Sequence, residues 1–176
     1  MSLNRRQMDN LKTALPPSVH PETRVLILGS LPGDRSLSMQ EYYAHPSNTF
    51  WWLVGEVLGE ALVVLPYSRR LDVLQSYGVG LWDVIASGRR TGSLDAAIRN
   101  AVPRNIVAFA GALPELRAIA FNGATAARVG RRQLIGSEDR WHLIDLPSSS
   151  AANAGVPRSV KLAEWRAITP FVRSPS

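Results

Sequence analysis

Cysteine is absent from this sequence of 176 residues. Its absence excludes disulfide bonds, thiolate zinc sites and cysteine-ligated iron–sulfur clusters. Long hydrophobic runs are also missing, since no stretch approaches the length needed to span a bilayer. Residues 1–7 are polar and basic, unlike the apolar centre of a signal peptide. We therefore expect a cytoplasmic protein that does not enter a membrane.

Acidic residues are in the minority, with 14 Asp and Glu against 20 Lys and Arg, which gives a net charge of +6. Most of the positive residues are arginine, whose planar fork matches phosphate groups. The excess favours a nucleic acid as partner, because such contacts release counterions. A mildly basic surface that only aids solubility is the alternative. Histidine is scarce too, and His20, His45 and His142 lack the spacing of metal ligands, so we expect neither a metal site nor a cofactor.

The length and the 45% hydrophobic content fit one globular domain that can bury its own core. We expect residues 1–176 to form this single domain and to act as a monomer. Residues 1–22 contain three prolines and predict a short helix followed by an irregular lead-in. Residues 170–176 predict a polar tail.

Four apolar runs have the uninterrupted character of strands that are buried on both faces of a parallel sheet. They span residues 24–29, 79–85, 116–121 and 141–146. Helical spacing and capping residues predict helices at residues 47–58, 69–77, 93–101, 106–113, 124–132 and 159–168. Strands that alternate with helices predict an α/β fold, a three-layer α/β/α sandwich around a central four-stranded parallel sheet.

Each predicted strand ends in polar or turn-forming residues. These ends are Gly29-Ser30, Asp83, Asn122-Gly123 and Pro147-Ser148. Ligands of open α/β sheets bind beyond the carboxyl ends of the strands. We therefore expect all four ends to line one cleft.

Residues 29–52 leave the first of these strands and predict a segment that is mostly loop, yet it is rich in aromatic residues. The turn from Gly29 through Ser30, Leu31 and Pro32 to Gly33 resembles a phosphate-binding loop only loosely, because no Gly-Lys-Ser follows. Further along, two aromatic residues, Tyr42 and Tyr43, either can stack on a planar base or belong to the core. Asn48 either holds a water molecule through its amide or caps the helix that follows. His45 lies within the same segment, and it either has a role at the site or is an ordinary loop residue.

Two other groups of residues suggest contacts with a nucleic acid backbone. Ser148, Ser149 and Ser150 follow Pro147 without an adjacent base, so they suit hydrogen bonding to phosphate better than nucleophilic catalysis. Arg89 and Arg90 follow the second strand and predict a positive track for DNA, although such arginine pairs are usually just solvated.

Taken in order, the motifs of the chain resemble a known family. The segments are GSLPG, YYAHPSNTFWW, GLWDVI, GSLDAAI, FNGATA and LPSSSAAN. Their order, over about residues 24–165, resembles the uracil-DNA glycosylase superfamily and most closely its hypoxanthine-DNA (deoxyinosine) glycosylase branch.

The resemblance implies a monofunctional glycosylase of DNA repair. It would hydrolyse the N-glycosidic bond of a deaminated base, with hypoxanthine favoured, after the base has flipped out of DNA, and leave an abasic site. Asn48, from the H-P-x-N-x-F-W segment, would position the attacking water. Tyr43 would stack on the base, with Phe50 shaping the pocket behind it, and Asp83 and Asn122 would read the base edge.

Three positions depart from the patterns of the superfamily. Leu31 stands where uracil- and mismatch-specific branches have a water-positioning Asp or Asn, and Leu146 replaces the histidine of the late His-Pro-Ser motif. Ser47 stands where the hypoxanthine branch often has arginine. Two alternatives therefore stay open. One is a uracil- or thymine-mismatch-specific glycosylase, and the other is a catalytically silent DNA-binding member of the fold.

Overall fold

A computed structural model describes residues 10–175, and a four-stranded parallel sheet runs through its centre. Its strands are Val25–Gly29 (β2), Val79–Asp83 (β3), Ala118–Asn122 (β6) and His142–Leu146 (β7), in the order β3-β2-β6-β7. Every neighbouring pair is parallel. The predicted sheet is therefore confirmed.

In β2, β3 and β6, burial on both faces of the sheet explains the uninterrupted apolar runs. The edge strand β7 differs from the predicted buried strand, because His142 and Asp145 are exposed. Successive side chains of a strand point to opposite faces. In β2, Val25 and Ile27 belong to one core cluster, whereas Leu26 and Leu28 belong to the other, and all four are fully buried. A strand with water on one face would have alternated polar and apolar residues instead.

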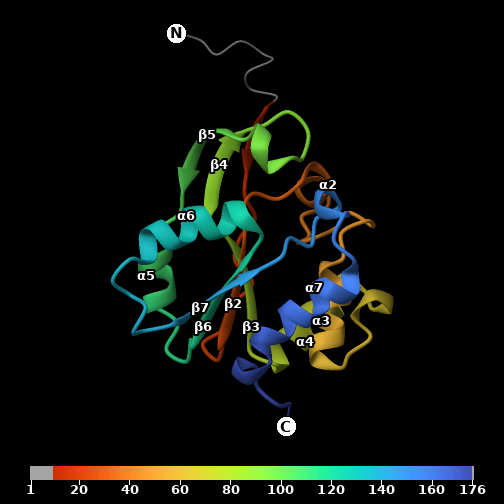
Figure 1. Ribbon diagram of the computed structural model, residues 1–176, viewed down its shortest axis with the longest axis vertical. Helices are drawn as coiled ribbons and strands as arrows, with labels where there is room; N and C mark the ends of the chain where they lie inside the picture. The colour runs from red at the N-terminus through yellow and green to blue at the C-terminus, as the bar shows by residue number, and fades with distance from the viewer. Residues whose placement is uncertain (1–9, 176) are drawn as a thin grey trace.

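Helices cover both faces, which gives the three layers seen in Figure 1. On one side lie Phe50–Leu58 (α3), Tyr67–Ser76 (α4) and Arg158–Trp165 (α7), and on the other lie Ile106–Gly111 (α5) and Ala124–Leu134 (α6). The predicted α/β/α sandwich is confirmed. The bounds of these five helices agree with the predicted ones to within a few residues. Gly59 directly follows α3, and its φ of 71° is the left-handed conformation that glycine adopts readily.

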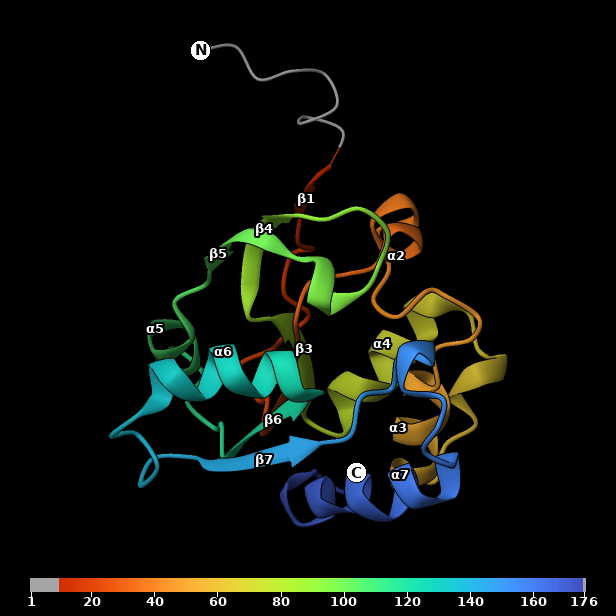
Figure 2. The ribbon, with the colours of Figure 1, turned by 45° about the horizontal axis from the view of Figure 1, so that its top comes forward.

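A second, antiparallel sheet was not predicted, and it lies above the central one in Figure 2. It consists of Leu11–Thr13 (β1), Ile85–Arg89 (β4) and Arg99–Pro103 (β5), in the order β1-β4-β5. The chain leaves the central sheet after Asp83, so the second predicted strand is two strands, β3 and β4, that belong to different sheets.

The helix predicted over residues 93–101 is wrong. The chain forms a short 3₁₀ turn at Asp95–Ala97 (η2) and then enters β5, which pairs with β4. The predicted N-terminal helix lies partly on residues 1–9, outside the described residues, and the described part forms β1 instead. Within residues 29–52, a short helix at Asp34–Met39 (α2) was also not anticipated.

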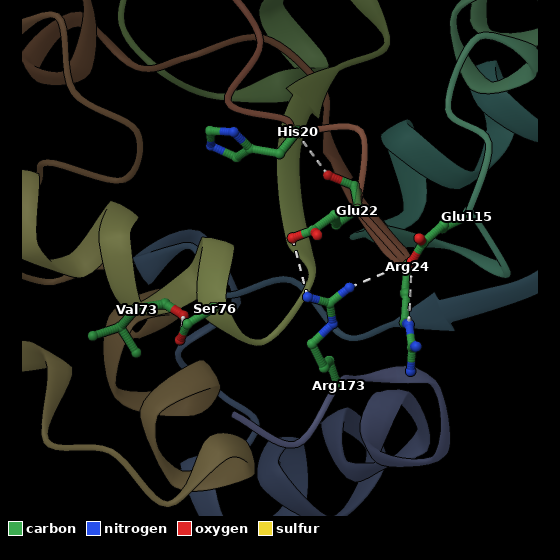
Figure 3. Close-up of polar contacts among 8 residues, drawn as sticks. His20, Glu22, Arg24, Val73, Ser76, Glu115 and Arg173 are labelled. Carbon is green, nitrogen blue, oxygen red and sulfur yellow. Dashed lines mark hydrogen bonds and ion pairs between the residues drawn. The ribbon is translucent and has the colours of Figure 1, made fainter. Parts of the chain in front are cut away.

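The C-terminal segment is fastened to the amino-terminal edge of the central sheet, as Figure 3 shows. After α7, a 3₁₀ helix spans Arg166–Phe171 (η4), and Arg173 then donates hydrogen bonds to Glu22 (3.0 Å) and Glu115 (3.4 Å). Glu115 also lies 3.8 Å from the guanidinium of Arg24, which directly precedes β2. The predicted polar tail is thus partly integrated into the fold. Among residues 10–175, no helix combines the length and apolar composition that crossing a membrane requires.

Candidate functional site

The carboxyl ends of all four central strands line one cavity of about 1220 Å³, as the sequence predicted. The register places the last residue of β2, Gly29, beside the last residue of β3, Asp83. It likewise places Asn122, which ends β6, beside Leu146, which ends β7. Most of the predicted site residues line this cavity: Gly29, Ser30, Leu31, Pro32, Tyr43, His45, Asn48, Asp83, Asn122, Pro147, Ser148, Ser149 and Ser150.

Gly29 allows two polar side chains to meet above the end of β2. A Cβ atom at this position would lie 2.6 Å from Asp83 Oδ1 and 3.1 Å from the Tyr43 hydroxyl. The first distance is shorter than any normal contact, so only glycine fits without displacing the carboxyl group. The glycine therefore serves the close approach of Asp83 and Tyr43.

Asp83 is a buried carboxyl group in an unusual electrostatic setting. Its side chain is 3% exposed, and its Oδ2 has no hydrogen-bond partner among the described residues. The net effect of its surroundings raises the pKa of Asp83 to about 7: burial raises it most, Arg104 and Arg90 partly offset this, and Asp95 adds to it. A carboxyl group of this kind exchanges its proton near neutral pH, as groups at functional sites often do.

Tyr43 is held rigidly at the wall of the cavity. Its ring stacks on Phe50, with the ring centres 3.8 Å apart and the planes at 15°. Phe50 is fully buried and lies behind Tyr43, outside the cavity lining, which agrees with a supporting position. Burial, strengthened by Asp83, raises the pKa of the Tyr43 hydroxyl above its ordinary value. The hydroxyl is therefore protonated at neutral pH and able to donate a hydrogen bond.

Two hydrogen bonds between Asn122 and Ser149 connect the end of β6 to the loop that follows β7. The amide of Asn122 donates to Ser149 Oγ at 2.9 Å, and its oxygen accepts from the Ser149 backbone N–H at 3.0 Å. Ser149 is 1% exposed, and its carbonyl accepts hydrogen bonds from the backbone and side chain of Thr49, just before α3. The predicted contact of the Ser149 side chain with DNA does not fit this buried position.

Asn48 lies at the start of α3 and also lines the cavity. Its Oδ1 accepts a hydrogen bond at 3.0 Å from the N–H of Phe50, the first residue of α3, although the N-cap position itself is Thr49. The residue is also partly buried and lines the cavity, so it is not a cap that faces only solvent. Because an amide oxygen has two lone pairs and the amide nitrogen two hydrogens, Asn48 retains capacity to bind a water molecule.

His45 lies at the exposed rim of the same cavity. Its Nδ1 accepts from the Ser47 N–H at 3.1 Å and lies 2.6 Å from the Ser47 hydroxyl. The side chain is thereby oriented by its neighbour in the loop.

The two arginines predicted to contact DNA do not line the cavity. Arg90 is 1% exposed and donates hydrogen bonds to the carbonyls of Leu31, Pro32 and Gly92. It therefore braces the turn after β2 from inside, because a buried guanidinium needs acceptors for its donors. Arg89 is partly exposed on β4, where it pairs with Leu11 and Arg99.

Sequence reasoning missed the part of the cavity wall that comes from the connection between β4 and β5. Ser93, Leu94 and Asp95 line the cavity there, and Asp95 accepts a hydrogen bond from Ser30 Oγ at 2.7 Å. The GSLDAAI segment was one of the motifs, but its apolar spacing suggested a helix. The described residues contain no group of three or more His, Asp or Glu side chains that could hold a metal ion.

Comparisons with known proteins agree with this architecture. A family model described as the uracil DNA glycosylase superfamily matches residues 16–167. A relative from Methanosarcina acetivorans named hypoxanthine DNA glycosylase is 37% identical over 158 residues, which cover 90% of this chain and 98% of the relative. A second of the same name, from Methanosarcina barkeri, is 40% identical over 112 residues, covering 64% of this chain and 71% of the relative.

A solved structure is similar as well. The solution NMR structure of a Methanosarcina acetivorans protein, provisionally described as a uracil DNA glycosylase, superposes with a TM-score of 0.80 at 37% identity. The match covers 90% of this chain and 96% of that protein. With the cavity at the carboxyl ends of β2, β3, β6 and β7, these matches show that the chain belongs to the uracil DNA glycosylase superfamily.

Proposed function

We propose that this protein is a monofunctional DNA glycosylase that removes hypoxanthine from deaminated DNA and leaves an abasic site. The observation that carries the proposal is the convergence of Asn48, Tyr43, Asp83 and Asn122 on one cavity. The names of the two relatives support hypoxanthine as the base. The positive net charge of the chain suits a DNA substrate.

Chemistry on a base within a duplex requires the nucleotide to leave the stack and enter a pocket. The cavity of about 1220 Å³ has room for a purine nucleotide and the adjoining backbone. Tyr43 is the group proposed to stack on the flipped base. Because Phe50 already packs against its ring, the aromatic surface is in place before the base arrives.

Asn48 is the residue proposed to position the attacking water. The water oxygen bonds to the anomeric carbon of the sugar as the bond to the base nitrogen breaks, and the electron pair of that bond leaves with the base. The proton that the water loses passes to solvent, and the departing base takes up one proton. A neutral amide is a very weak base, so Asn48 contributes orientation instead of proton abstraction. Its bond to the Phe50 N–H fixes the direction of the amide for this task.

Asp83 and Asn122 are the groups proposed to recognise the base edge. Hypoxanthine presents an N–H donor next to a carbonyl acceptor, and an amide together with a carboxyl group offers matching partners. A neutral Asp83 would donate to the departing base, whereas an ionised Asp83 would only accept. Burial of both residues excludes the water that would compete for these contacts.

A panel of duplexes tests the substrate first. Duplexes that contain inosine, uracil, a thymine mismatch or xanthine are incubated with the protein, and base release is measured after cleavage of abasic sites. We expect inosine to be processed fastest. Preference for uracil or thymine would favour the mismatch-specific alternative, and release from none would favour a silent DNA-binding protein, which Leu31 and Leu146 leave open.

Asn48→Ala tests the mechanism. We expect base release to be nearly abolished while duplex binding, measured by fluorescence anisotropy, is largely retained. Asn105→Ala is a matched control because the Asn105 side chain also caps a helix, α5, by accepting from the Ala108 N–H, and does not line the cavity. Each variant removes a side-chain acceptor of a backbone N–H in the first turn of a helix, a loss of about 1 kcal/mol. Retained inosine cleavage by Asn48→Ala would refute the proposed role.

We further infer that the protein acts as a monomer in the cytoplasm. Residues of one chain are enough to line the cavity, which supports a monomer, and a DNA substrate suits a protein inside the cell. Light scattering of the purified protein at working concentration tests the monomer, and a stable dimer would contradict it.

A further inference from the structure

One strongly exposed leucine lies at the cavity. Among the described residues, eight large apolar side chains are largely exposed, and only Leu94 of these also lines the cavity. It is 59% exposed and directly precedes the 3₁₀ turn η2. An apolar side chain that lines the cavity and is also exposed to solvent can contact a molecule that approaches the cavity.

The loop that carries Leu94 is fastened on both sides of it. The preceding Ser93 accepts a hydrogen bond from the Asp34 N–H at 3.3 Å, and the following Asp95 accepts from Ser30 at 2.7 Å. Arg99 donates to the Ala96 carbonyl at 2.8 Å and so braces η2 itself. Figure 2 shows this connection between β4 and β5 reaching toward α2. Leu94 is therefore held in place while its side chain stays exposed.

The loop of residues 148–153, which also lines the cavity, has no comparable side chain. Residues 148–153 are serine, alanine and asparagine only, and they include no large apolar side chain. Ser149 is buried against Asn122, and Asn153 donates to the Ser148 carbonyl at 3.4 Å. This loop can hydrogen-bond to a DNA backbone, but it cannot fill a gap between base pairs.

We propose that Leu94 is the residue that enters the base stack and fills the space left by the extruded nucleotide, an inference that rests on the proposed function. A flipped base leaves a cavity in the duplex that is closed by apolar base faces. A leucine buried there is removed from water and keeps the flipped state from collapsing, as apolar wedges do in other DNA complexes. Because the loop is already fixed, little entropy is lost when the side chain enters.

The test compares duplex with single-stranded substrate. We expect Leu94→Ala to slow base release from an inosine duplex by about tenfold or more, the factor that corresponds to burying a leucine side chain. Release from a single-stranded inosine oligonucleotide should change by less than about twofold, because no paired stack has to be held open. Leu94→Met should restore most of the duplex rate. A fluorescent purine analogue next to the lesion reports extrusion independently, and its signal should fall in Leu94→Ala.

Val102→Ala is the matched control. Val102 is 53% exposed on β5, on the same small sheet, but does not line the cavity. Its substitution should leave both rates unchanged, which separates intercalation from a general effect of surface truncation. An equal rate of duplex cleavage by wild type and Leu94→Ala, or an equal loss on single strands, would overturn the inference while leaving the proposed function intact. A wild-type protein that cleaves neither substrate would instead refute the proposed function.

Discussion

Asp83→Asn replaces a buried carboxyl group by an amide of nearly the same shape and so isolates the effect of its charge. Burial raises the pKa of Asp83 from an ordinary value of 3.8 to about 7. The folded protein therefore favours the neutral carboxyl. Protonated Asp83 therefore contributes to the free energy of unfolding. This contribution is fully present below a pH of about 4 and is lost as the pH rises through 7.

The magnitude follows from the two pKa values. A difference of about three in pKa corresponds to about 4 kcal/mol in the free energy of unfolding once ionisation is complete. Between pH 5 and pH 8, the contribution of Asp83 should fall by about 3 kcal/mol. The asparagine variant cannot lose this contribution, so its stability relative to wild type should rise by that amount over the same interval.

Urea unfolding at pH 5, 6, 7 and 8, followed by the fluorescence of the five tryptophans, measures this difference. All other titrating groups are common to both proteins and cancel. Asp72→Asn removes an exposed carboxylate paired with Arg69 and controls for the loss of one negative charge. A difference between Asp83→Asn and wild type that stays constant with pH, or that falls as the pH rises, would refute the argument.

Two further substitutions test the geometry of the cavity. Gly29→Ala should displace Asp83, because the new Cβ would lie 2.6 Å from its Oδ1, and we expect a loss of about 1–3 kcal/mol in urea unfolding together with slower base release. Tyr43→Ala should raise the activation free energy of base release by about 1–3 kcal/mol, the value of a base–aromatic stack. Tyr43→Phe keeps the ring and should retain most of that contribution in the same single-turnover assay, so an equal loss in both variants would argue against stacking.

The central sheet could be predicted because its signal is local. Each buried strand is a short apolar run whose residues face a helical layer on either side. The apolar composition alone therefore predicts a strand that is buried on both faces. Asp83 is informative for the same reason: a charged residue at the end of such a run belongs at the carboxyl edge of the sheet. The cavity followed from a general rule of parallel sheets rather than from any single residue.

The small antiparallel sheet could not be predicted because its pairing is not local. β5 is exposed along its whole length, so its residues carry no burial pattern, and the apolar spacing just before it resembles a helix turn. Only the contact with β4 makes it a strand. The same contact places Leu94 and Asp95 at the cavity, which is why both escaped prediction.

Arg90 illustrates a second limit. Its neighbour Arg89 and the basic composition of the chain suggested an exposed DNA track, because charged residues are usually solvated. Whether an arginine is exposed depends on the acceptors that the fold brings to it. Here the turn after β2 supplies carbonyls from residues more than fifty positions away in the chain.

The sequence by itself determined the layered α/β architecture, the edge of the sheet at which the cavity forms, and the motifs that line it. These depend on hydrophobic runs and on residues next to them in the chain. The tertiary structure alone decided the raised pKa of Asp83, the internal position of Arg90 and Ser149, and the placement of Leu94 at the cavity. Those properties depend on burial and on partners distant in sequence, which no local pattern records.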